Sequence, residues 1–460
     1  MVVWIQNPFD SLPLEGSRKM RYWLMCEAFA RAGWRVLLFT SDFSHATKKR
    51  RAVEATRGTR ESRETWGGEA GLAASAASGG EAGLASLATL SSPASPNFSL
   101  HFIPTRPYSR NVSFVRIASH RAYAREWLKM AEDPALPRPD LIVASMPTIS
   151  GAAAALALGR RFGAKVVVDV QDAWPETFER IVPRFALWPL RRAARRIYRD
   201  SDLVTGVCSR YRDLTGRADY YLAYHGIETR SDSATDFTNC HGLKIGASAV
   251  EATRGSRESR GTWGGEAGLA ASTASSGASS LASLSPLATP KSPQRLETIR
   301  LVYSGNLGRS YDLATLVAVV EADPRLTLDV AGFGAFSSSC PRIKFHGFLS
   351  ESDLQSIFAA CDIGVVPMAP DSWVGIPNKF ADYSRAGLRI VSSLGGESSA
   401  LLEKYRCGAT YRVGDAASLA SAIKVASSLS SAASREMCER EFDATKIYDA
   451  YVARVQELFK

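Results

Sequence analysis

The stretch Ile299–Ala331, IRLVYSGNLGRSYDLATLVAVVEADPRLTLDVA, decides the fold class of this chain. It opens with a short apolar strand pattern at Ile299–Tyr303, passes through a loop with two glycines, and continues with helical periodicity over Leu313–Glu321. A second strand pattern follows at Leu326–Ala331. Strand, helix and strand in this order predict a βαβ unit with two parallel strands.

The same alternation continues outward from this stretch to both ends of the chain. Further strands are predicted at Val2–Gln6, Arg35–Thr40, Leu141–Ala144, Lys165–Val170, Leu203–Val207, Ile343–His346, Ile363–Pro367 and Arg389–Ser392. Further helices are predicted at Met20–Arg31, Ile149–Phe162, Arg191–Tyr198, Ser352–Cys361, Asn378–Gly387, Leu419–Leu429 and Thr445–Leu458. We therefore predict an α/β protein with two Rossmann-like domains, whose parallel sheets are covered on both faces and face each other across a cleft.

Two copies of one segment interrupt this alternation. Val53–Ser78 and Val250–Ser275 match at 23 of 26 positions, and both run into tails rich in Ala, Ser, Gly and Pro. Such tracts bury too little apolar surface to offset the entropy lost on ordering. We predict two disordered low-complexity insertions, at about 52–97 and about 246–294. A duplicated binding element is the alternative interpretation.

Length and composition fit two domains of ordinary size. The chain has 460 residues, of which 45% are hydrophobic and 22% charged, and this excludes a collagen or a disulfide-dense miniprotein. We predict an N-terminal domain at 1–225, a second domain at 226–440 and a C-terminal helix within 441–460 that could cross back to the first domain.

The net charge indicates the class of binding partner, and the cysteines indicate the redox state of the cellular compartment. A net charge of +10 favours an anionic partner, which could be nucleic acid, a phosphorylated small molecule or a membrane surface. The seven cysteines form no C-x-x-C pair, which suits a reducing compartment. Because we find neither a signal-peptide pattern nor an apolar run of about 18 residues, we expect a cytoplasmic protein.

The six histidines show no ligand spacing, and the sequence contains neither H-E-x-x-H nor G-x-S-x-G. These absences disfavour metal catalysis and a serine hydrolase, and we predict neither a metal nor a cofactor.

Two loops in the second half carry features of a phosphate site. Ser304–Arg309, SGNLGR, follows a strand, and its glycines allow close backbone approach while Arg309 adds a positive charge. Gly375–Lys379, GIPNK, opens a helix whose N-terminus favours an anion, and Asp382 on that helix could accept hydrogen bonds from sugar hydroxyls. A plain turn and an ordinary capped helix with Lys379 facing solvent are the alternatives.

The loop Asp169–Glu176, DVQDAWPE, follows a strand of the first half. A carboxylate such as Asp172 at the carboxyl end of a parallel strand lies where a ligand in the cleft would bind. Trp174 could stack on a sugar, although packing into the core is the favoured interpretation.

A basic helix follows an aromatic segment in the first half. Phe185–Leu190 leads into arginines at helical spacing, and this pattern is typical of a surface that binds an anionic membrane. These arginines are Arg191, Arg192, Arg195, Arg196 and Arg199. A solvated basic face is the alternative, and nucleic acid is not predicted because no known reader motif accompanies the charges.

Several of these stretches resemble one enzyme family. VVDVQDAWPETF (Val167–Phe178), LVYSGNLGRSYDL (Leu301–Leu313), KFHGFLSESDL (Lys344–Leu354) and VGIPNKFADYSRAG (Val374–Gly387) resemble the retaining glycosyltransferases of family four, and most of all the branch that builds bacterial surface polysaccharides. PLEGSRKMRYWL (Pro13–Leu24) is similar to the glycine loop and first helix of that family. The resemblance implies the GT-B fold, with the nucleotide-sugar donor on the second domain and the acceptor on the first.

The resemblance also implies roles for individual residues. Catalytic roles would fall to Arg309 and Lys379 beside the diphosphate and to Asp172 near the donor sugar or the acceptor. The donor would be bound by Gly16, Ser17, Gly305, Asn306, His346, Gly347, Phe348, Asn378 and Asp382. Of these, His346 to Phe348 would lie beside the base and Asp382 beside the ribose. Apart from the resemblance, the spacing of the arginines predicts a membrane surface made of Arg191, Arg192, Arg195 and Arg196.

The chain departs from the family pattern at its acidic pair and at its phosphate cations. Val374 and Asp382 stand where two glutamates are usual, and Asn306 and Tyr311 stand where Arg and Lys are common. We expect a metal-independent hexosyl- or amino-sugar transferase that acts with retention on a glycan or polyprenyl-linked acceptor, peripheral on the inner face of the plasma membrane. A GT-B nucleotide-sugar epimerase and a catalytically silent binding subunit are the alternatives.

Overall fold

The computed structural model describes residues 1–51, 97–109, 113–179, 182–229, 298–308, 310–369 and 372–460, and the backbone of 89–91. Apart from 89–91 and Asn97, the two predicted insertions lie outside the described residues, and so does Arg309.

Within the described residues, the first half of the chain forms one eight-stranded sheet in the order β3–β4–β2–β1–β5–β6–β7–β8. Every neighbouring pair is parallel except β3 and β4. The strands are β1 (Val2–Gln6), β2 (Arg35–Ser41), β3 (Thr89–Ser91), β4 (Phe98–Ile103), β5 (Leu141–Met146), β6 (Lys165–Val170), β7 (Leu203–Gly206) and β8 (Tyr221–Leu222). The helices are α1 (Arg21–Arg31), α2 (Phe114–Met130), α3 (Ile149–Phe162), α4 (Trp188–Asp200) and α5 (Tyr211–Thr215).

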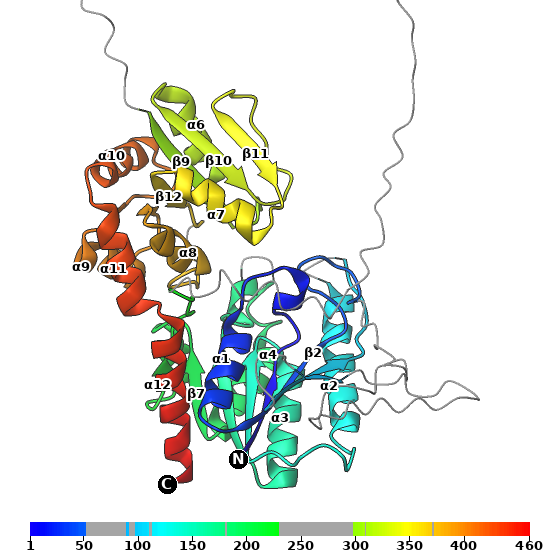
Figure 1. Cartoon of the computed structure of the whole chain (residues 1–460). Coiled ribbons are helices and arrows are strands. Elements are labelled where there is room, and N and C mark those ends of the chain that lie inside the picture. The colour runs from blue at the N-terminus through cyan, green and yellow to red at the C-terminus, as the bar shows by residue number, and fades with distance from the viewer. Residues whose placement is uncertain are drawn as a thin grey trace, which may run out of the picture.

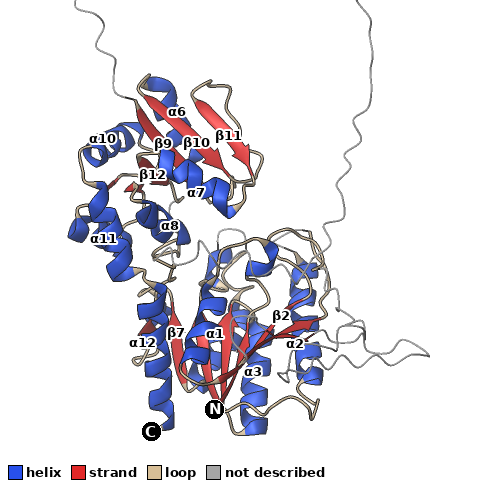
Figure 2. Ribbon diagram, viewed as in Figure 1, coloured by secondary structure: helices blue, strands red, loops and turns tan. Residues whose placement is uncertain are grey.

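The second half, over its described residues, forms a six-stranded parallel sheet in the order β11–β10–β9–β12–β13–β14. Its strands are β9 (Ile299–Ser304), β10 (Leu326–Ala331), β11 (Ile343–Gly347), β12 (Ile363–Val366), β13 (Arg389–Ser392) and β14 (Gly408–Thr410). Its helices are α6 (Leu313–Ala322), α7 (Glu351–Ala360), α8 (Asn378–Ala386), α9 (Glu397–Tyr405), α10 (Ala416–Ser427) and α11 (Ser431–Glu441). Both sheets carry helices on their two faces, as Figure 2 shows.

The alternation of side chains along a strand explains why helices cover both faces of each sheet. Successive side chains of a strand point to opposite faces, so a fully apolar strand needs apolar cover on each side. In β5, Leu141 and Val143 pack with α1, whereas Ile142 and Ala144 pack with α2 and α3. The structure confirms the predicted fold class, two Rossmann-like α/β domains built on parallel sheets.

The chain crosses between the two halves twice, and hydrogen bonds link the two crossing segments to each other. Ile227 donates its N–H to Phe442 O at 2.8 Å, and Ala444 N donates back to Ile227 O at 3.0 Å. After this second crossing, α12 (Ala444–Gln456) runs beside α1, and its Tyr448 and Tyr451 belong to the core of the first half. Figure 1 shows the two lobes one above the other, with α12 returning along the first lobe.

Candidate active site

The loops that follow β9 and β10 are held tightly together. Gly332 has a φ of +149°, and a Cβ at this position would lie 1.7 Å from Gly305 O. Gly305 N donates to Ala331 O at 2.8 Å, and Leu307 N donates to Phe333 O at 2.9 Å. These two amides are therefore already paired, so the loop offers a phosphate fewer free amides than the sequence suggests. Asn306 lies exposed between them.

Lys379 is a buried cation in the first turn of α8. The residue is only 7% exposed, and Nζ lies 4.2 Å and 4.3 Å from the ring centroids of Tyr303 and Tyr311. Nζ has no hydrogen-bond partner among the described residues. Burial lowers the pKa of Lys379 to about 7, and the nearby carboxylate of Asp382 opposes this shift. An anion bound at this point would supply the hydrogen-bonded counter-ion that the ammonium lacks.

Lys379 reaches the loop after β9 because Gly305 has no side chain. A Cβ at Gly305 would lie 3.3 Å from Lys379 Nζ. The neighbouring Asn378 also has a buried Oδ1 without a partner among the described residues. The first N–H groups of a helix lack intrahelical partners and favour negative charge. The start of α8 and the loop at Gly305 thus form a site suited to an anionic group such as a diphosphate.

Asp382 connects this site to the first half of the chain. It lies one turn after Asn378 on α8, and its Oδ1 is 3.4 Å from Nε of Arg18. Arg18 follows Gly16 and Ser17, and Gly16 has a left-handed φ of +72° that turns the chain toward α1. The contact brings the loop at Gly16 and Ser17 beside α8. Sequence patterns did not identify Arg18, since no motif links it to a residue so far along the chain.

His346, Gly347 and Phe348 lie at the end of β11, which is the edge strand of the second sheet. His346 Nε2 is 2.7 Å from Asp329 Oδ1, and Gly347 O accepts a hydrogen bond from Gly332 N at 2.7 Å. Phe348 is 73% exposed, and so this edge presents an aromatic ring to solvent. A ring in this position is available to stack on a flat ligand.

Asp172 lies in the loop after β6, and the residue is exposed to solvent. Partial loss of hydration raises the pKa of its carboxyl, and the charge of Arg116 opposes this shift. Its charge also raises the pKa of Tyr311, after the larger effect of burial, and Tyr311 is one of the two rings beside Lys379. The charge of Asp172 is thus felt at Tyr311, and a role for Asp172 near the donor sugar or the acceptor stays a prediction.

The predicted basic helix begins earlier than its arginines suggest. Trp188 and Pro189 form the first turn of α4, where proline is well tolerated. Arg191 is turned inward, with Nε 3.3 Å from Glu176 Oε1 and Nη2 paired with Glu179. Arg191 is therefore mostly removed from solvent by its two carboxylate partners, and its predicted place on a membrane surface stays a prediction. Arg192, Arg195 and Arg196 are exposed.

A buried ion pair in the first half of the chain was absent from the sequence predictions. Asp169 is fully buried and accepts hydrogen bonds from Arg21 Nε at 2.9 Å and Arg21 Nη2 at 2.8 Å. Tyr22 and Thr205 donate to the same carboxylate. The sequence marks Asp169 only as a carboxylate at a strand end, and its partner on α1 is distant in the chain.

Among the described residues, no group of three or more His, Cys, Asp or Glu side chains could hold a metal ion. None of the helices in those ranges is both long enough and apolar enough to span a membrane.

Each half of the chain matches a family model of known proteins. Residues 20–220 match the family model of the glycosyl transferase 4-like domain, and residues 299–427 match that of glycosyl transferases group 1. None of the curated protein sequences matches the chain.

Solved structures share the fold at low sequence identity. Sucrose-phosphate synthase from Thermosynechococcus elongatus has a TM-score of 0.63 at 12% identity, over 100% of this chain and 99% of that one. HepE from Anabaena, in complex with UDP and glucose, has a TM-score of 0.55 at 14% identity, over 99% of each chain. OtsA has a TM-score of 0.56 at 12% identity, over 100% of this chain and 99% of that one. With a glycosyltransferase domain in each half and two Rossmann-like domains stacked as in these structures, the chain is a glycosyltransferase of the GT-B type.

Proposed function

We propose that this protein transfers a sugar, with retention of configuration, from a nucleotide-diphosphate donor to a glycan or polyprenyl-linked acceptor. The observation that carries this proposal is the ammonium of Lys379, which is buried beside Gly305 without a hydrogen-bond partner among the described residues. A buried ammonium whose hydrogen bonds are unmade within the described part of the chain, at a helix N-terminus, is suited to the diphosphate of such a donor.

The same site supports a mechanism for the departure of the diphosphate. Negative charge grows on the leaving diphosphate as the glycosidic bond breaks, so an interaction with Lys379 and the amides of α8 strengthens in the transition state. Such preferential binding of the transition state is what accelerates the reaction. A protein cation in this position also makes a metal-independent reaction chemically reasonable. The leaving phosphate itself would accept the proton of the acceptor hydroxyl.

The family resemblance gives the remaining donor contacts of this proposal. Phe348 would stack on the base, and Asp382 would accept hydrogen bonds from the ribose beside Arg18. The solved complexes of HepE contain UDP and UDP-glucose, and this supports a UDP-sugar as the first donor to test here. A hexose or an amino sugar fits the family resemblance, and a role in surface polysaccharide synthesis fits its branch.

The decisive experiment measures donor turnover. The protein is incubated with a panel of UDP-, GDP- and TDP-sugars, with and without glycan acceptors, and release of nucleoside diphosphate is measured. We expect turnover with one donor and a loss of about 100-fold to 1,000-fold in Lys379→Met. Lys424→Met, which changes an exposed lysine on α10, is the matched control.

Three outcomes would contradict the proposal. Conversion of the donor sugar to its epimer without an acceptor would indicate an epimerase. Nucleotide binding without turnover would indicate a silent binding subunit. Equal turnover in Lys379→Met and Lys424→Met would remove Lys379 from the mechanism.

A peripheral membrane location is the final part of the proposal. Phe185 and Trp188 are 81% and 60% exposed, and Arg192, Arg195 and Arg196 are exposed close to them. Exposed aromatic rings with cations are suited to an anionic membrane surface. We expect co-sedimentation with vesicles that contain phosphatidylglycerol, and release in high salt. Equal binding after Arg192, Arg195 and Arg196 become Ala would contradict the role of this helix.

A further inference from the structure

A groove of about 870 Å³ lies between α2 and the loop after β4. Apart from Glu126, its α2 wall is one stripe of the helix, because the residues recur at intervals of three and four: Phe114, Ile117, Ala118, Arg121, Ala122 and Arg125. The buried residues of α2, such as Tyr123 and Trp127, lie on the opposite face of the helix. The stripe is therefore the outward face of α2, and Arg106 adds a further arginine from the loop after β4.

This groove combines an exposed aromatic ring with unneutralised cations. Phe114, in the first turn of α2, is 89% exposed, and Arg106, Arg121 and Arg125 are exposed as well. Among the described residues that line the groove, Glu126 alone is acidic, and it is already paired with two basic side chains of α2. Neither Arg106 nor Arg121 forms an ion pair with any residue that the structure describes. The groove therefore suits a partner that has both anionic and apolar parts.

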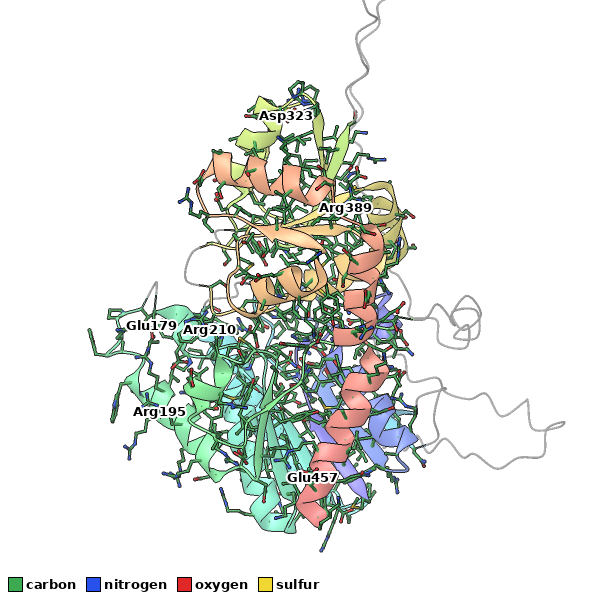
Figure 3. The ribbon with its side chains drawn as sticks, turned by 90° about the vertical axis from the view of Figure 1, so that its left-hand side faces the viewer. Glu179, Arg195, Arg210, Asp323, Arg389 and Glu457 are labelled. Carbon is green, nitrogen blue, oxygen red and sulfur yellow. The ribbon has the colours of Figure 1, made fainter. Side chains whose placement is uncertain are left out.

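The helix α4 repeats this pattern on its own outward face. Trp188, in its first turn, is 60% exposed, and exposed arginines follow at intervals of three and four: Arg192, Arg195 and Arg199. The guanidinium of Arg192 lies 5.7 Å from the ring centroid of Trp188. Figure 3 shows Arg195 on the outer side of the first lobe, below Glu179. Each of the two helices thus begins with an exposed aromatic residue and continues with arginines.

The two helices belong to one layer and run in the same direction. The helix α3 packs against both α2 and α4, and the buried faces of all three contribute to one core on a single face of the first sheet. Because α2 and α4 each connect two parallel strands, both begin at the carboxyl ends of the strands. Together the three helices contain eleven Lys and Arg residues against two Asp and Glu. The aromatic first turns therefore lie at the same edge of one strongly basic layer.

We propose that this layer docks on an anionic membrane through two contacts, the groove of α2 and the outward face of α4. The inference rests on the proposed membrane location and adds α2 as a second contact. Phe114 and Trp188 enter the headgroup region, and the arginines contact the lipid phosphates. Two separate contacts resist rotation about either one, so the first lobe binds in a single orientation. The aromatic turns lie at the carboxyl ends of the strands, and this orientation brings that edge of the lobe to the lipid headgroups.

The test measures how the full-length protein partitions onto sedimenting vesicles. The vesicles contain either phosphatidylcholine alone or equal parts of phosphatidylcholine and phosphatidylglycerol, and we expect binding only to the second kind. Arg106→Gln combined with Arg121→Gln removes two cations from the groove and should weaken binding by about tenfold or more. Phe114→Ser should weaken it by about fivefold. Lys424→Gln combined with Arg440→Gln, two exposed charges of the second lobe, is the matched control and should change binding by less than about twofold.

Three results would overturn the inference. The first is unchanged vesicle binding in both α2 variants. The second is equal binding to the vesicles with and without phosphatidylglycerol. The third is tighter binding to duplex DNA than to the anionic vesicles, which would assign the basic layer to a nucleic acid.

Donor turnover without vesicles separates this inference from the proposed transferase. The α2 variants should keep the turnover of the wild type, because their residues lie outside the donor site. If the wild type turned over no donor and the α2 variants still lost vesicle binding, the transferase would be refuted and the membrane surface would stand. Turnover in the wild type together with unchanged vesicle binding in the α2 variants would refute the α2 contact alone.

Discussion

Arg18 and Asp382 form an ion pair between the two halves of the chain, with Nε 3.4 Å from Oδ1. Asp382 belongs to the helix whose first turn holds Lys379, and Arg18 belongs to the loop that precedes α1. Because both side chains are mostly removed from solvent, their attraction is screened less than that of a surface pair. This ion pair therefore couples α8 to the first half of the chain.

The first prediction concerns this coupling. Arg18→Gln and Asp382→Asn each remove one partner, so their effects on kcat/KM should not add in the double variant. Contacting residues usually show coupling free energies of about 0.5–3 kcal/mol. A full double-mutant cycle on donor turnover measures this value. Additivity within about 0.3 kcal/mol would show that the pair has no influence on catalysis.

The second prediction concerns pH. In the free protein, the pKa of Lys379 is about 7, so its ammonium is mostly charged below pH 7 and mostly neutral above pH 8. The proposed site binds a diphosphate through the charged form of Lys379, so it predicts that the affinity for UDP falls as pH rises from 7 to 9, by up to about tenfold per pH unit. Isothermal titration calorimetry across this range measures the slope. Lys379→Met should bind UDP weakly and without this slope, and a parallel slope in that variant would contradict the assignment.

The third prediction concerns the close contact of two loops. Gly332→Ala would place a Cβ 1.7 Å from Gly305 O in a backbone region that favours glycine. The loop after β9 would have to move, and we expect UDP binding to weaken by at least about tenfold. Gly395→Ala is the control, because a Cβ there meets nothing within 4 Å. Equal UDP affinity in the two variants would show that the position of the loop does not matter.

The fourth prediction concerns stability. Arg21 holds the pKa of Asp169 well below its usual value, against the opposing effect of burial, and Thr205 and Tyr22 assist. The charged form is thus the stabilising one, and its contribution is present above about pH 4 and lost as pH falls further. Asp169→Asn should lower the free energy of unfolding by about 3–5 kcal/mol, since it leaves Arg21 buried without a counter-charge.

Urea denaturation at pH 7 measures this change. Asp449→Asn is the matched control, because Asp449 pairs with another arginine of α1, Arg31, at 2.7 Å on the surface. Exposed pairs of this kind contribute about 0–1 kcal/mol. Comparable losses in the two variants would show that the buried pair adds no special stability.

Most of the fold can be predicted from the sequence because its strands are short, apolar and regularly spaced by helices. The helix α2 is the main element that the patterns do not predict. Its buried positions include Ser119 and His120 as well as Tyr123 and Trp127, so hydrophobic spacing alone gives a weak signal. The inward face of α11 includes the buried Ser434, so hydrophobic spacing gives only a weak signal for this helix as well.

The candidate site could be predicted only in part. Lys379 follows a helix start, and helix starts are visible in a sequence. Its burial between Tyr303 and Tyr311 depends on three separate elements meeting in space, which no local pattern shows.

The return of α12 to the first half has a consequence for how the chain folds during synthesis. Tyr448, Tyr451 and Val455 fill part of the core beneath α1, but they leave the ribosome only after the whole second half has been made. Until then, the nascent first lobe has an apolar face open to water on that side. Completion of the N-terminal lobe is therefore a late event, and a stop in translation after the second sheet would leave a chain that chaperones and proteases can recognise.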